Sequence, residues 1–431
     1  MQYLEAAKKY ESEIIALRRM FHEWPELSGK EEETVARICA ELDKIGVEYT
    51  VVPQGGVLAK ITGGKNSGKA VLLRADMDAL PVTETADNLI MGARSCVSKN
   101  EGVMHACGHD GHVAMLLGAA KILKEHAAEL EGTVYLCFER GEEGGGNVRF
   151  LFAHIEKQGI QIDSVFGLHL LADLPSGQFA VNDGAMMAGI MWFTILLEGK
   201  GGHGSRPDEA NSPIDCFAAI YQRLQAMRVS KLSPFETCTY SIGSVNSGAR
   251  GNVIPQTLTF SGTMRAFDRD GVGMQFHKEL RSTVDSLAQA YGCKATYKNY
   301  ELPGLAVVND KKTAVWCREL LGTLVGTENV GTAQPWMASE SYAQYLEQWP
   351  GVFAFLGISN PEKGVGAAHH HPAFDLDEDV LATGAAAAAA YAAQYLANAA
   401  KLPGGRKMTY RQLLKKLGKD EAAVNSIFDA V

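Results

Sequence analysis

The stretch that organises this chain is MHACGHDGH, residues 104–112. An apolar strand-like run, AVLLRADMD at residues 70–78, precedes it, and a helix-like run follows. In an extended segment a Cys-x-His pair points its thiolate and imidazole to the same side, so both can bind one cation. Taken alone, the pair is equally consistent with a loop that holds a buried cysteine and hydrogen-bonded histidines. The side chains here that can bind a metal or move a proton are His105, Cys107, His109 and Asp110.

The composition is that of a globular protein with more than one domain. The chain has 431 residues, of which 46% are hydrophobic and 21% charged, so a large core is readily buried. A net charge of −9 argues against nucleic acid or an anionic membrane surface as a partner. The N-terminus lacks an apolar signal-peptide core, and no apolar run approaches the roughly 18 residues of a membrane span. The eight scattered cysteines suggest a reducing compartment, so we predict a soluble cytoplasmic protein.

Three apolar strands separated by helical segments each lead into reactive side chains. Residues 71–74 lead to Asp76 and Asp78, residues 133–138 lead to Glu142-Glu143, and residues 164–170 contain His169. The alternation of strands and helices predicts βαβ units and a mostly parallel sheet, and ligands gather at the carboxyl ends of such strands. A solvated acidic loop is the alternative for Glu142-Glu143, but the glycines that follow suggest a close backbone approach. The coincidence of three strand ends favours a metal site.

Residues 63–70, GGKNSGKA, are close to a phosphate-binding loop. The segment lacks the Ser or Thr that would hold magnesium, and it leads into a strand rather than a helix. Because Gly-Gly and Ser-Gly are turn signals, we predict a hairpin turn here.

The series of apolar strands that lead into reactive side chains stops at residue 188 and resumes near residue 299. Residues 188–298 follow the order β-α-β-β-α-β, which is the ferredoxin-like arrangement. This segment carries His203, Asn252 and Arg265, each of which is also acceptable as a turn or surface residue. We therefore predict a catalytic domain from residues 1–187 and 299–403, an inserted domain at 188–298, and a helical extension at 404–431. The extension has two short amphipathic helices that pack on the body or dock a partner, and we favour packing.

Five side chains form the candidate ligand set: Cys107, His109, Glu143, His169 and one of His369–His371. Five ligands, one of them a thiolate that can bridge, fit two divalent cations better than one. Two such cations acidify a water molecule and polarise a carbonyl, which leaves Glu142 free to move the proton. Asp76 or Asp78 would orient a ligand histidine. The thiolate and imidazoles favour zinc, the carboxylate leaves manganese or cobalt possible, and nucleophilic chemistry at Cys107 is the competing interpretation.

Six motifs occur in one order along residues 10–400 and together resemble the aminoacylase/carboxypeptidase family of co-catalytic metallohydrolases. The similarity is to its amidohydrolase branch, which includes hippurate hydrolases and hydrolases of indole-acetyl amino acids. The resemblance implies a zinc-peptidase-like α/β domain, a ferredoxin-like lid and a homodimer formed through that lid. The motifs are RRMFHEWPELS (18–28), RADMDALP (74–81), residues 104–112, GEEGG (141–145), residues 199–207 and residues 370–379.

Carried over by position, the resemblance assigns a role to each candidate residue. Glu142 would be the general base, and His203 would steady the tetrahedral oxyanion. Asn252 and Arg265 would hold the substrate carboxylate, a task that suits a guanidinium fork, under a lid that closes. The His-x-Pro-x-Phe pattern selects one residue of the histidine run. The implied metal ligands are Cys107, His109, Glu143, His169 and His370.

Some positions depart from the family pattern. The family commonly has Gln-Pro where Glu139-Arg140 stand, and Glu-Asp where Glu340-Ser341 stand. His369, His371 and the segment after residue 404 are also unusual. None of these changes removes a ligand or the base, and they bear on the specificity for the acyl group.

The predicted function is hydrolysis of the amide bond of a small N-acyl amino acid, with two divalent cations, most simply zinc or manganese. A dipeptidase or carboxypeptidase with the same machinery is the alternative within enzymes. A ligand-binding relative without turnover would lack a ligand or the base, and here all six are present. An interaction protein that uses residues 404–431 is the remaining alternative.

Overall fold

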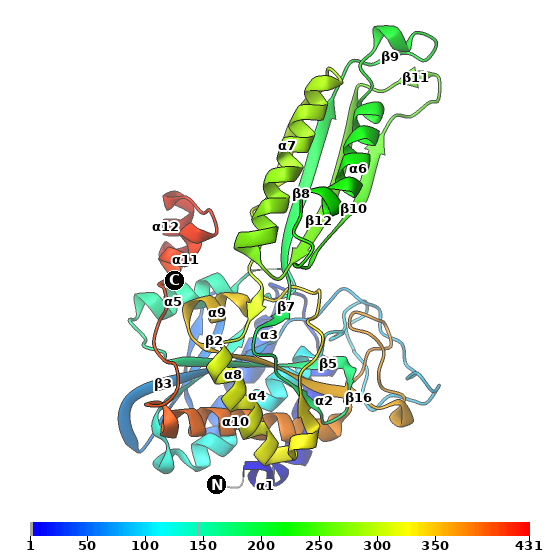
Figure 1. The fold of residues 1–431 in the computed structure, drawn as a ribbon. Coiled ribbons are helices and arrows are strands. Elements are labelled where there is room, and N and C mark those ends of the chain that lie inside the picture. Colours follow the sequence, from blue (N-terminus) through cyan, green and yellow to red (C-terminus); the bar gives the residue numbers. More distant parts are fainter. Residues whose placement is uncertain (1–2, 145) are drawn as a thin grey trace. The chain divides into compact units, whose positions relative to one another are not determined.

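The computed structural model describes residues 3–144 and 146–431, which form two compact units (Figure 1). The first unit contains the described residues up to Met186, together with Val308–Gln334 and Ser341–Val431. The second contains Met187–Val307 and Pro335–Glu340. The chain passes between them at the short strands β7 (Ala185–Met187) and β14 (Val307–Val308).

A mixed sheet forms the centre of the first unit. Its four central strands are mutually parallel, as the βαβ pattern predicts, and antiparallel strands are added at both sides. In spatial order the strands are β1 (Glu48–Val52), β2 (Gly56–Thr62), β4 (Glu131–Glu139), β3 (Lys65–Asp76), β5 (Ser164–Pro175), β16 (Gly351–Ser359), β6 (Phe179–Ala180) and β15 (Val330–Gly331).

The hairpin predicted at residues 63–70 is wrong. Strands β2 and β3 are not neighbours, because β4 lies between them and pairs with both. The glycines serve a close crossing of the chain over the start of β4: Gly63 N–H donates to Gly132 O at 2.7 Å. A Cβ atom at Gly63 would lie 2.4 Å from Leu130 O, so only glycine fits.

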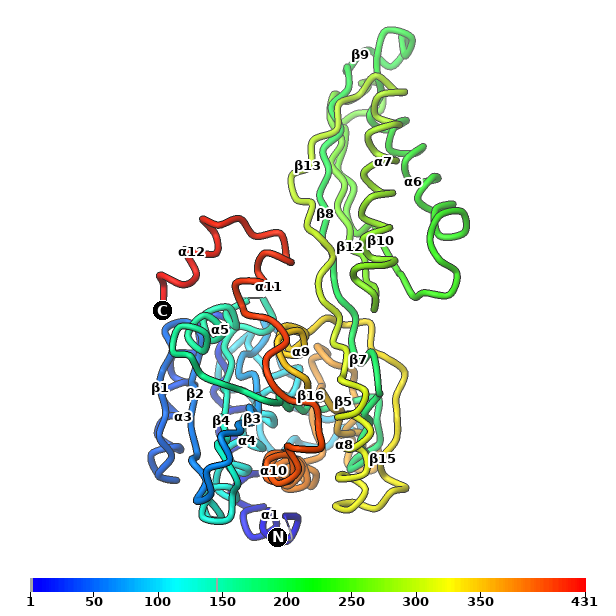
Figure 2. The backbone as a smooth tube through the Cα atoms, turned by 60° about the vertical axis from the view of Figure 1, so that its left-hand side comes forward, coloured from blue at the N-terminus to red at the C-terminus, as the bar shows by residue number. Residues whose placement is uncertain are grey.

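Helices cover both faces of this sheet. Helices α4 and α10 lie on one face and α5 and α9 on the other (Figure 2). The helices of the first unit are α1 (Tyr3–Lys8), α2 (Glu11–Glu23), α3 (Glu32–Ile45), α4 (His109–Glu125), α5 (Val148–Lys157), α8 (Lys311–Val325), α9 (Ala343–Gln348), α10 (Leu381–Asn398), α11 (Tyr410–Lys416) and α12 (Glu421–Asp429).

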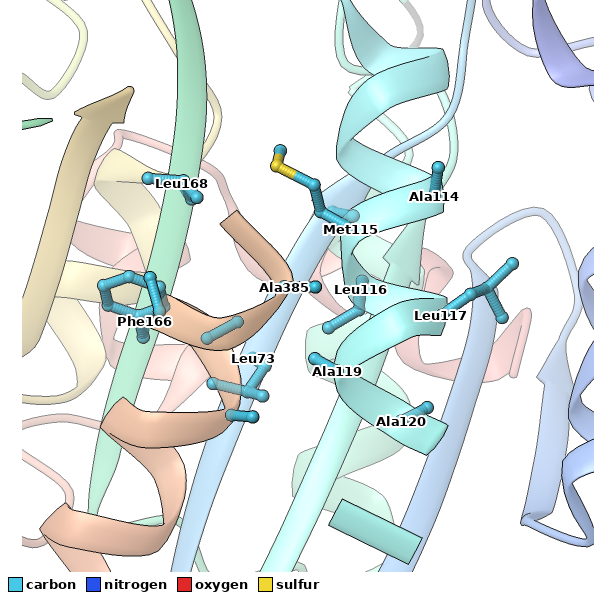
Figure 3. Close-up of a cluster of buried hydrophobic side chains, with 14 of the residues drawn as sticks. Leu73, Ala114, Met115, Leu116, Leu117, Ala119, Ala120, Phe166, Leu168 and Ala385 are labelled. Carbon is cyan, nitrogen blue, oxygen red and sulfur yellow. The ribbon is translucent and has the colours of Figure 1, made fainter. Parts of the chain in front are cut away.

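The alanine-rich helix α10 packs closely against α4 and the sheet. Figure 3 shows Ala385 of α10 among Met115, Leu73 and Phe166. A Cβ atom at Gly384 would lie 2.0 Å from Met115 Sδ, so the small residues permit this close approach. The stretch Glu378–Asn398 is long and apolar enough to cross a membrane, but 78% of its apolar window is buried inside the protein. Its hydrophobicity is that of a core helix.

Side-chain alternation along β3 separates an apolar face from a polar one. Val71, Leu73 and Ala75 belong to the core with α4 and α10. Arg74 and Asp76 point to the opposite face, because successive side chains of a strand alternate. Arg74 therefore lies on the side of the sheet that α9 covers, where Tyr345 of that helix donates to Glu139, a partner of Arg74.

The second unit has the predicted ferredoxin-like order. It runs β8 (Gly189–Glu198), α6 (Pro213–Ser230), β10 (Cys238–Ser247), β12 (Thr257–Ala266), α7 (Met274–Ala290) and β13 (Lys294–Tyr300). The sheet order is β10-β12-β8-β13, all antiparallel, and the helices pack on it through apolar side chains such as Phe193, Phe260 and Phe276. A small ribbon, β9 (Gly202–His203) with β11 (Val253–Ile254), lies at one end.

The C-terminal segment 404–431 packs on α5 and α9. Tyr410 is buried and its ring centroid lies 5.1 Å from that of Phe152. Arg406 donates to both Glu156 and Gln348 at 3.0 Å. The segment thus ties the C-terminal ends of the two helices together.

Deletion of residues 404–431 is expected to destabilise the first unit. The segment buries several large apolar side chains, each contributing about 1.5–3 kcal/mol, so we expect a loss on the order of 5 kcal/mol. The buried apolar side chains include Tyr410, Leu413, Leu414 and Phe428. Thermal unfolding of the parent and the truncated protein measures the loss. Lys415→Ala is the control, because its ion pair with Glu421 is exposed. An unchanged unfolding midpoint would instead mark the segment as available to a partner.

Candidate metal centre

The candidate ligands come from strand ends and from the start of one helix. Glu143 follows β4, His169 lies within β5, and Cys107 and His109 flank the N-terminus of α4. Between the last two stands Gly108, whose φ of 88° lies in the left-handed region. Glycine adopts this conformation at no steric cost, so the chain can turn into α4 with both side chains facing inward.

Cys107, His109 and His169 form the first ligand group. All three are buried, and their ligand atoms lie within 4.8 Å of one another. Cys107 Sγ is 3.7 Å from His169 Nε2. The Nδ1 atom of His169 lies 2.6 Å from Leu170 O, so Nδ1 carries the proton and Nε2 keeps its lone pair for a metal.

Cys107 also belongs to a second group, with Glu143 and His370. His370 Nε2 lies 3.3 Å from Glu143 Oε1, which is 4.0 Å from His109 Nε2. His370 has a φ of 65°, unusual for a residue with a side chain, and its N–H donates to Ala106 O at 2.8 Å. Because the two groups share one thiol, they are arranged for two neighbouring cations.

Two buried polar atoms test whether this donor set fits a metal. Among the described residues, His109 Nε2 and Glu143 Oε1 are fully buried and have no hydrogen-bond partner. Buried polar atoms are nearly always paired, so both atoms are suited to a ligand. Sulfur, nitrogen and carboxylate oxygen together suit zinc and similar divalent cations.

The surroundings of Cys107 do not favour nucleophilic chemistry. Burial, reinforced by the Glu143 carboxylate, raises the pKa of the Cys107 thiol well above its ordinary value. A nucleophilic cysteine needs a lowered pKa. A bound cation supplies the positive charge that a thiolate requires here, so the metal-ligand interpretation is the better one.

Asp78 orients His109 and also contacts the glutamate loop. Its Oδ1 lies 3.1 Å from His109 Nδ1, which directs Nε2 of that ring toward Glu143. The other carboxylate oxygen accepts the Glu143 N–H at 2.8 Å. One carboxylate therefore holds two ligands in register.

Asp76 has a different set of partners. It accepts from Arg74 at 2.7 Å and from His112 Nδ1 at 2.6 Å, and it lies 3.7 Å from His109 Nε2. Burial opposes its charge, but Arg74, His109 and His112 together hold the pKa of Asp76 well below its ordinary value. Asp76 is thus an ionised carboxylate beneath the ligands rather than the hydrogen-bond partner of His109 Nδ1.

Glu142 lies next to the ligands and is held from another segment. Its carboxylate comes within 4.8 Å of the ligand atoms of His109 and Glu143. Its Oε1 accepts the backbone N–H of Ser341 at 2.9 Å. The adjacent glutamates therefore have separate hydrogen-bond partners, which makes Glu142 a candidate for proton transfer.

Two further histidines lie near the candidate ligands: His369, which the resemblance passed over in favour of His370, and His112, which the sequence did not single out. His369 Nδ1 lies 3.7 Å from Cys107 Sγ, and its Nε2 accepts the Ala172 N–H at 3.1 Å. Burial, with help from His370, lowers the pKa of His369 to about 3, so it is neutral. His112 accepts the Leu170 N–H at 2.9 Å. The signal for His112 was its position one helical turn after His109.

His105 and Asp110, noted in the opening motif, are not among these ligand groups. Asp110 accepts from Arg18 and from His22, both at 2.8 Å. The ring nitrogens of His105 are buried without a hydrogen-bond partner. Burial lowers the pKa of His105 to about 4.

The remaining predicted residues belong to the second unit. His203 lies on β9 opposite Val253, and Gly204 N–H donates to Asn252 O at 2.9 Å, so these two residues are neighbours. Arg265 lies near the far end of β12, opposite Ile190 and Thr239. Within this unit Arg265 is therefore separated from His203 and Asn252 by the length of a strand.

Residues 72–394 match peptidase family M20/M25/M40. The chain is 36% identical over 389 residues to the IAA-amino acid hydrolase ILR1-like 4 of Arabidopsis thaliana, covering 89% of this chain and 86% of that protein. It is 34% identical over 378 residues to an N-acetylcysteine deacetylase of Bacillus subtilis, covering 87% and 95%. The fold is similar to that of a dinuclear metal-binding M20 peptidase of Bacillus subtilis, with a TM-score of 0.74, 30% identity and coverage of 90% and 99%.

The matched residues span both units and include each of the predicted ligands. Identity above 30% over most of each chain extends the likeness beyond the fold to the family itself. The protein therefore belongs to peptidase family M20/M25/M40.

Proposed function

We propose that this protein, a metallo-amidohydrolase by its family, cleaves the amide bond of small N-acyl amino acids. The observation that carries the proposal is the position of Glu142 beside two ligand groups that share Cys107. The names of its relatives, an IAA-amino acid hydrolase and an N-acetylcysteine deacetylase, both refer to amides of amino acids. A carboxypeptidase or dipeptidase activity is the second candidate, supported by the peptidase name of the family.

The residues present fit two divalent cations, zinc or manganese in our proposal. Cys107, His109, Glu143, His169 and His370 would hold them, and Asp78 keeps His109 and Glu143 in register. When bound, such cations acidify a water molecule and polarise the substrate carbonyl. Glu142 would take the proton of that water and deliver it to the leaving amine. Asp76, anchored by Arg74, supplies fixed negative charge beneath His109.

The second unit would supply the substrate contacts. Arg265 and Asn252 would hold the substrate carboxylate, and His203 would stabilise the tetrahedral oxyanion. Because His203 and Arg265 lie at opposite ends of the unit, we propose that a homodimer formed through this unit lets them serve different active sites. The eight cysteines are all free thiols in the structure, which supports a reducing cytoplasm as the location.

Metal analysis combined with a substrate panel tests the proposal. The purified protein would be analysed for bound metals and assayed with N-acetyl, N-benzoyl and indole-acetyl amino acids beside free dipeptides. About two divalent metals per chain, with hydrolysis that a chelator abolishes and added metal restores, is the expected result. Faster hydrolysis of free dipeptides than of every N-acyl amino acid would favour the peptidase alternative. No hydrolysis by the metal-loaded protein would overturn both.

Arg265→Ala is expected to raise KM for carboxylate-bearing substrates by about 10-fold or more, with a smaller effect on kcat. An interaction that binds the ground state and the transition state equally well lowers KM without raising kcat, so its loss raises KM alone. Steady-state kinetics with an N-acyl amino acid and its C-terminal amide provide the measurement, because the amide lacks the charge that Arg265 would bind. Arg223→Ala, an exposed change on α6, is the control. An equal rise in KM for both substrates would contradict the assignment.

A further inference from the structure

A single buried guanidinium connects the metal side of the site to the general base. Arg74 on β3 is only 6% exposed and uses three of its donors on three different partners. It donates to Asp76 at 2.7 Å, to Glu139 at 2.8 Å and to Ser341 Oγ at 2.9 Å. A planar guanidinium holds such partners in one fixed geometry.

The metal side of this connection runs through Asp76. Its carboxylate binds His112 Nδ1 at 2.6 Å, and His112 Nε2 in turn accepts the N–H of Leu170, the residue after His169. The same carboxylate faces His109 at 3.7 Å. Arg74 thus anchors the layer of side chains directly under two proposed ligands.

The base side runs through Ser341. The hydroxyl of Ser341 donates to Glu139 Oε1 at 2.6 Å, while its backbone N–H donates to Glu142 at 2.9 Å. Tyr345, one turn along α9, donates its hydroxyl to the other oxygen of Glu139 at 3.0 Å. Glu139 therefore holds the start of α9 at two points and sets where the Ser341 N–H meets Glu142.

The charges in this cluster are balanced within it. A carboxylate buried as deeply as Glu139, at 0% exposure, is tolerated only with a paired cation and filled hydrogen bonds. Glu139 has both, because Arg74 is its cation and the hydroxyls of Ser341 and Tyr345 donate to its two oxygens. The Ser341 side chain is neutral and touches both Arg74 and Glu139, so the contact holds one cation and one carboxylate.

We propose that Arg74, Glu139 and Ser341 are positioning residues for Glu142, and that Glu139 and Ser341 form a compensated pair. This inference rests on the proposed function only through the role of Glu142 as the base. In this pair the Glu139 carboxylate on β4 balances the Arg74 charge, and the side chain at position 341 stays neutral. The backbone N–H at position 341 then orients the base carboxylate without carrying charge itself.

Ser341→Ala tests the positioning role. We expect kcat to fall by about 10- to 100-fold, the usual cost of losing a partner that orients catalytic groups, with KM and metal content little changed. Ser341→Thr keeps the hydroxyl and is expected to restore most of the lost kcat. Ser164→Ala is the matched control, because it also removes a hydroxyl bonded at 2.8 Å, here to Tyr391, away from Glu142. A parent-like kcat in Ser341→Ala would overturn the positioning role.

A double replacement tests the compensation. Glu139→Gln removes the carboxylate charge that balances Arg74, and Ser341→Asp alone places a second carboxylate against Glu139, so each is expected to lower kcat and the thermal midpoint. The combined variant returns one carboxylate to the contact and is expected to recover kcat at least about 10-fold over the lower single variant. A double variant as impaired as the product of the two singles would overturn the compensation. Parent-like turnover in Glu142→Gln would instead overturn the proposed base. A failure of the base assignment is therefore distinguishable from a failure of the compensation.

Discussion

Glu142→Gln is expected to lower kcat by about 10²- to 10⁴-fold, the range attributed to general acid–base catalysis. Glutamine keeps the shape of the side chain and can still accept the Ser341 N–H, which now meets Glu142 Oε1 at 2.9 Å. It cannot accept a proton from water, so the chemical step loses its base. Steady-state kinetics on an N-acyl amino acid substrate measure the fall, and elemental analysis confirms that the metals remain.

The metal ligands are unchanged in this variant, which separates the base from the cations. Glu129→Gln is the control for the loss of one carboxylate, because Glu129 is exposed and lies beyond the C-terminal end of α4, whereas the candidate ligands lie at its N-terminus. Turnover within about threefold of the parent, with metals bound, would remove Glu142 from the proton-transfer role. Loss of both metals together with turnover would make Glu142 a ligand rather than a base.

Arg18→Met is expected to destabilise the first unit by about 3–5 kcal/mol, the usual cost of removing one partner from a buried ion pair. Arg18 on α2 is 1% exposed. Its guanidinium donates to Asp110 at 2.8 Å and to Asp375 at 2.9 Å. Methionine fills the space but removes the cation that these two buried carboxylates share. Chemical unfolding, followed for the first unit, measures the loss.

Arg19→Met is the matched control, because Arg19 is the adjacent residue and its side chain is 45% exposed. Its pairing with Glu378 lies at the surface, where an ion pair contributes about 0–1 kcal/mol. Equal effects of the two replacements would show that the buried cluster is not held by the charge of Arg18.

The difference between the parent and Arg18→Met also depends on pH. Burial opposes the charge on Asp375, but Arg18 and Arg94 hold its pKa below the ordinary value. A carboxylate with a lowered folded pKa stabilises the protein above its unfolded pKa of about 3.9, and this stabilisation is lost as the pH falls further. The two proteins are therefore expected to differ in full near neutral pH. The difference should shrink only as the pH falls below about 4 and through the lowered folded pKa of Asp375 and that of Asp110, which Arg18 also lowers.

The sequence supported the ligand assignments because their signals are local. The Cys-x-His pair at 107 and 109 and the adjacent glutamates at 142 and 143 stand at the ends of apolar runs. The carboxyl ends of parallel strands must lie at one edge, so their residues meet without any detailed knowledge of packing. The ferredoxin-like unit could be predicted equally well, because each of its strands and helices has a clear hydrophobic periodicity.

The order of the strands in the sheet and the contacts between distant residues could not be predicted from the sequence in the same way. Glycines such as those of residues 63–70 suit both hairpin turns and close backbone crossings. Only the insertion of β4 between β2 and β3 decides between the two. Asp76 ends β3 and Asp78 follows it by two residues. Only the placement of α4 makes Asp78, rather than Asp76, the partner of His109 Nδ1. Position 341 is about two hundred residues from Glu139 and Glu142, so no local pattern links them.

The sequence by itself thus determined which residues are the candidates for metal ligands and base, because residue type and spacing select them. The tertiary structure alone decided how those residues are held. Arg74 joins Asp76, Glu139 and Ser341 into one buried cluster, and Arg18 joins α2 to Asp110 and Asp375. Buried charges must find partners wherever the fold brings them, and those partners lie on strands and helices distant in the chain.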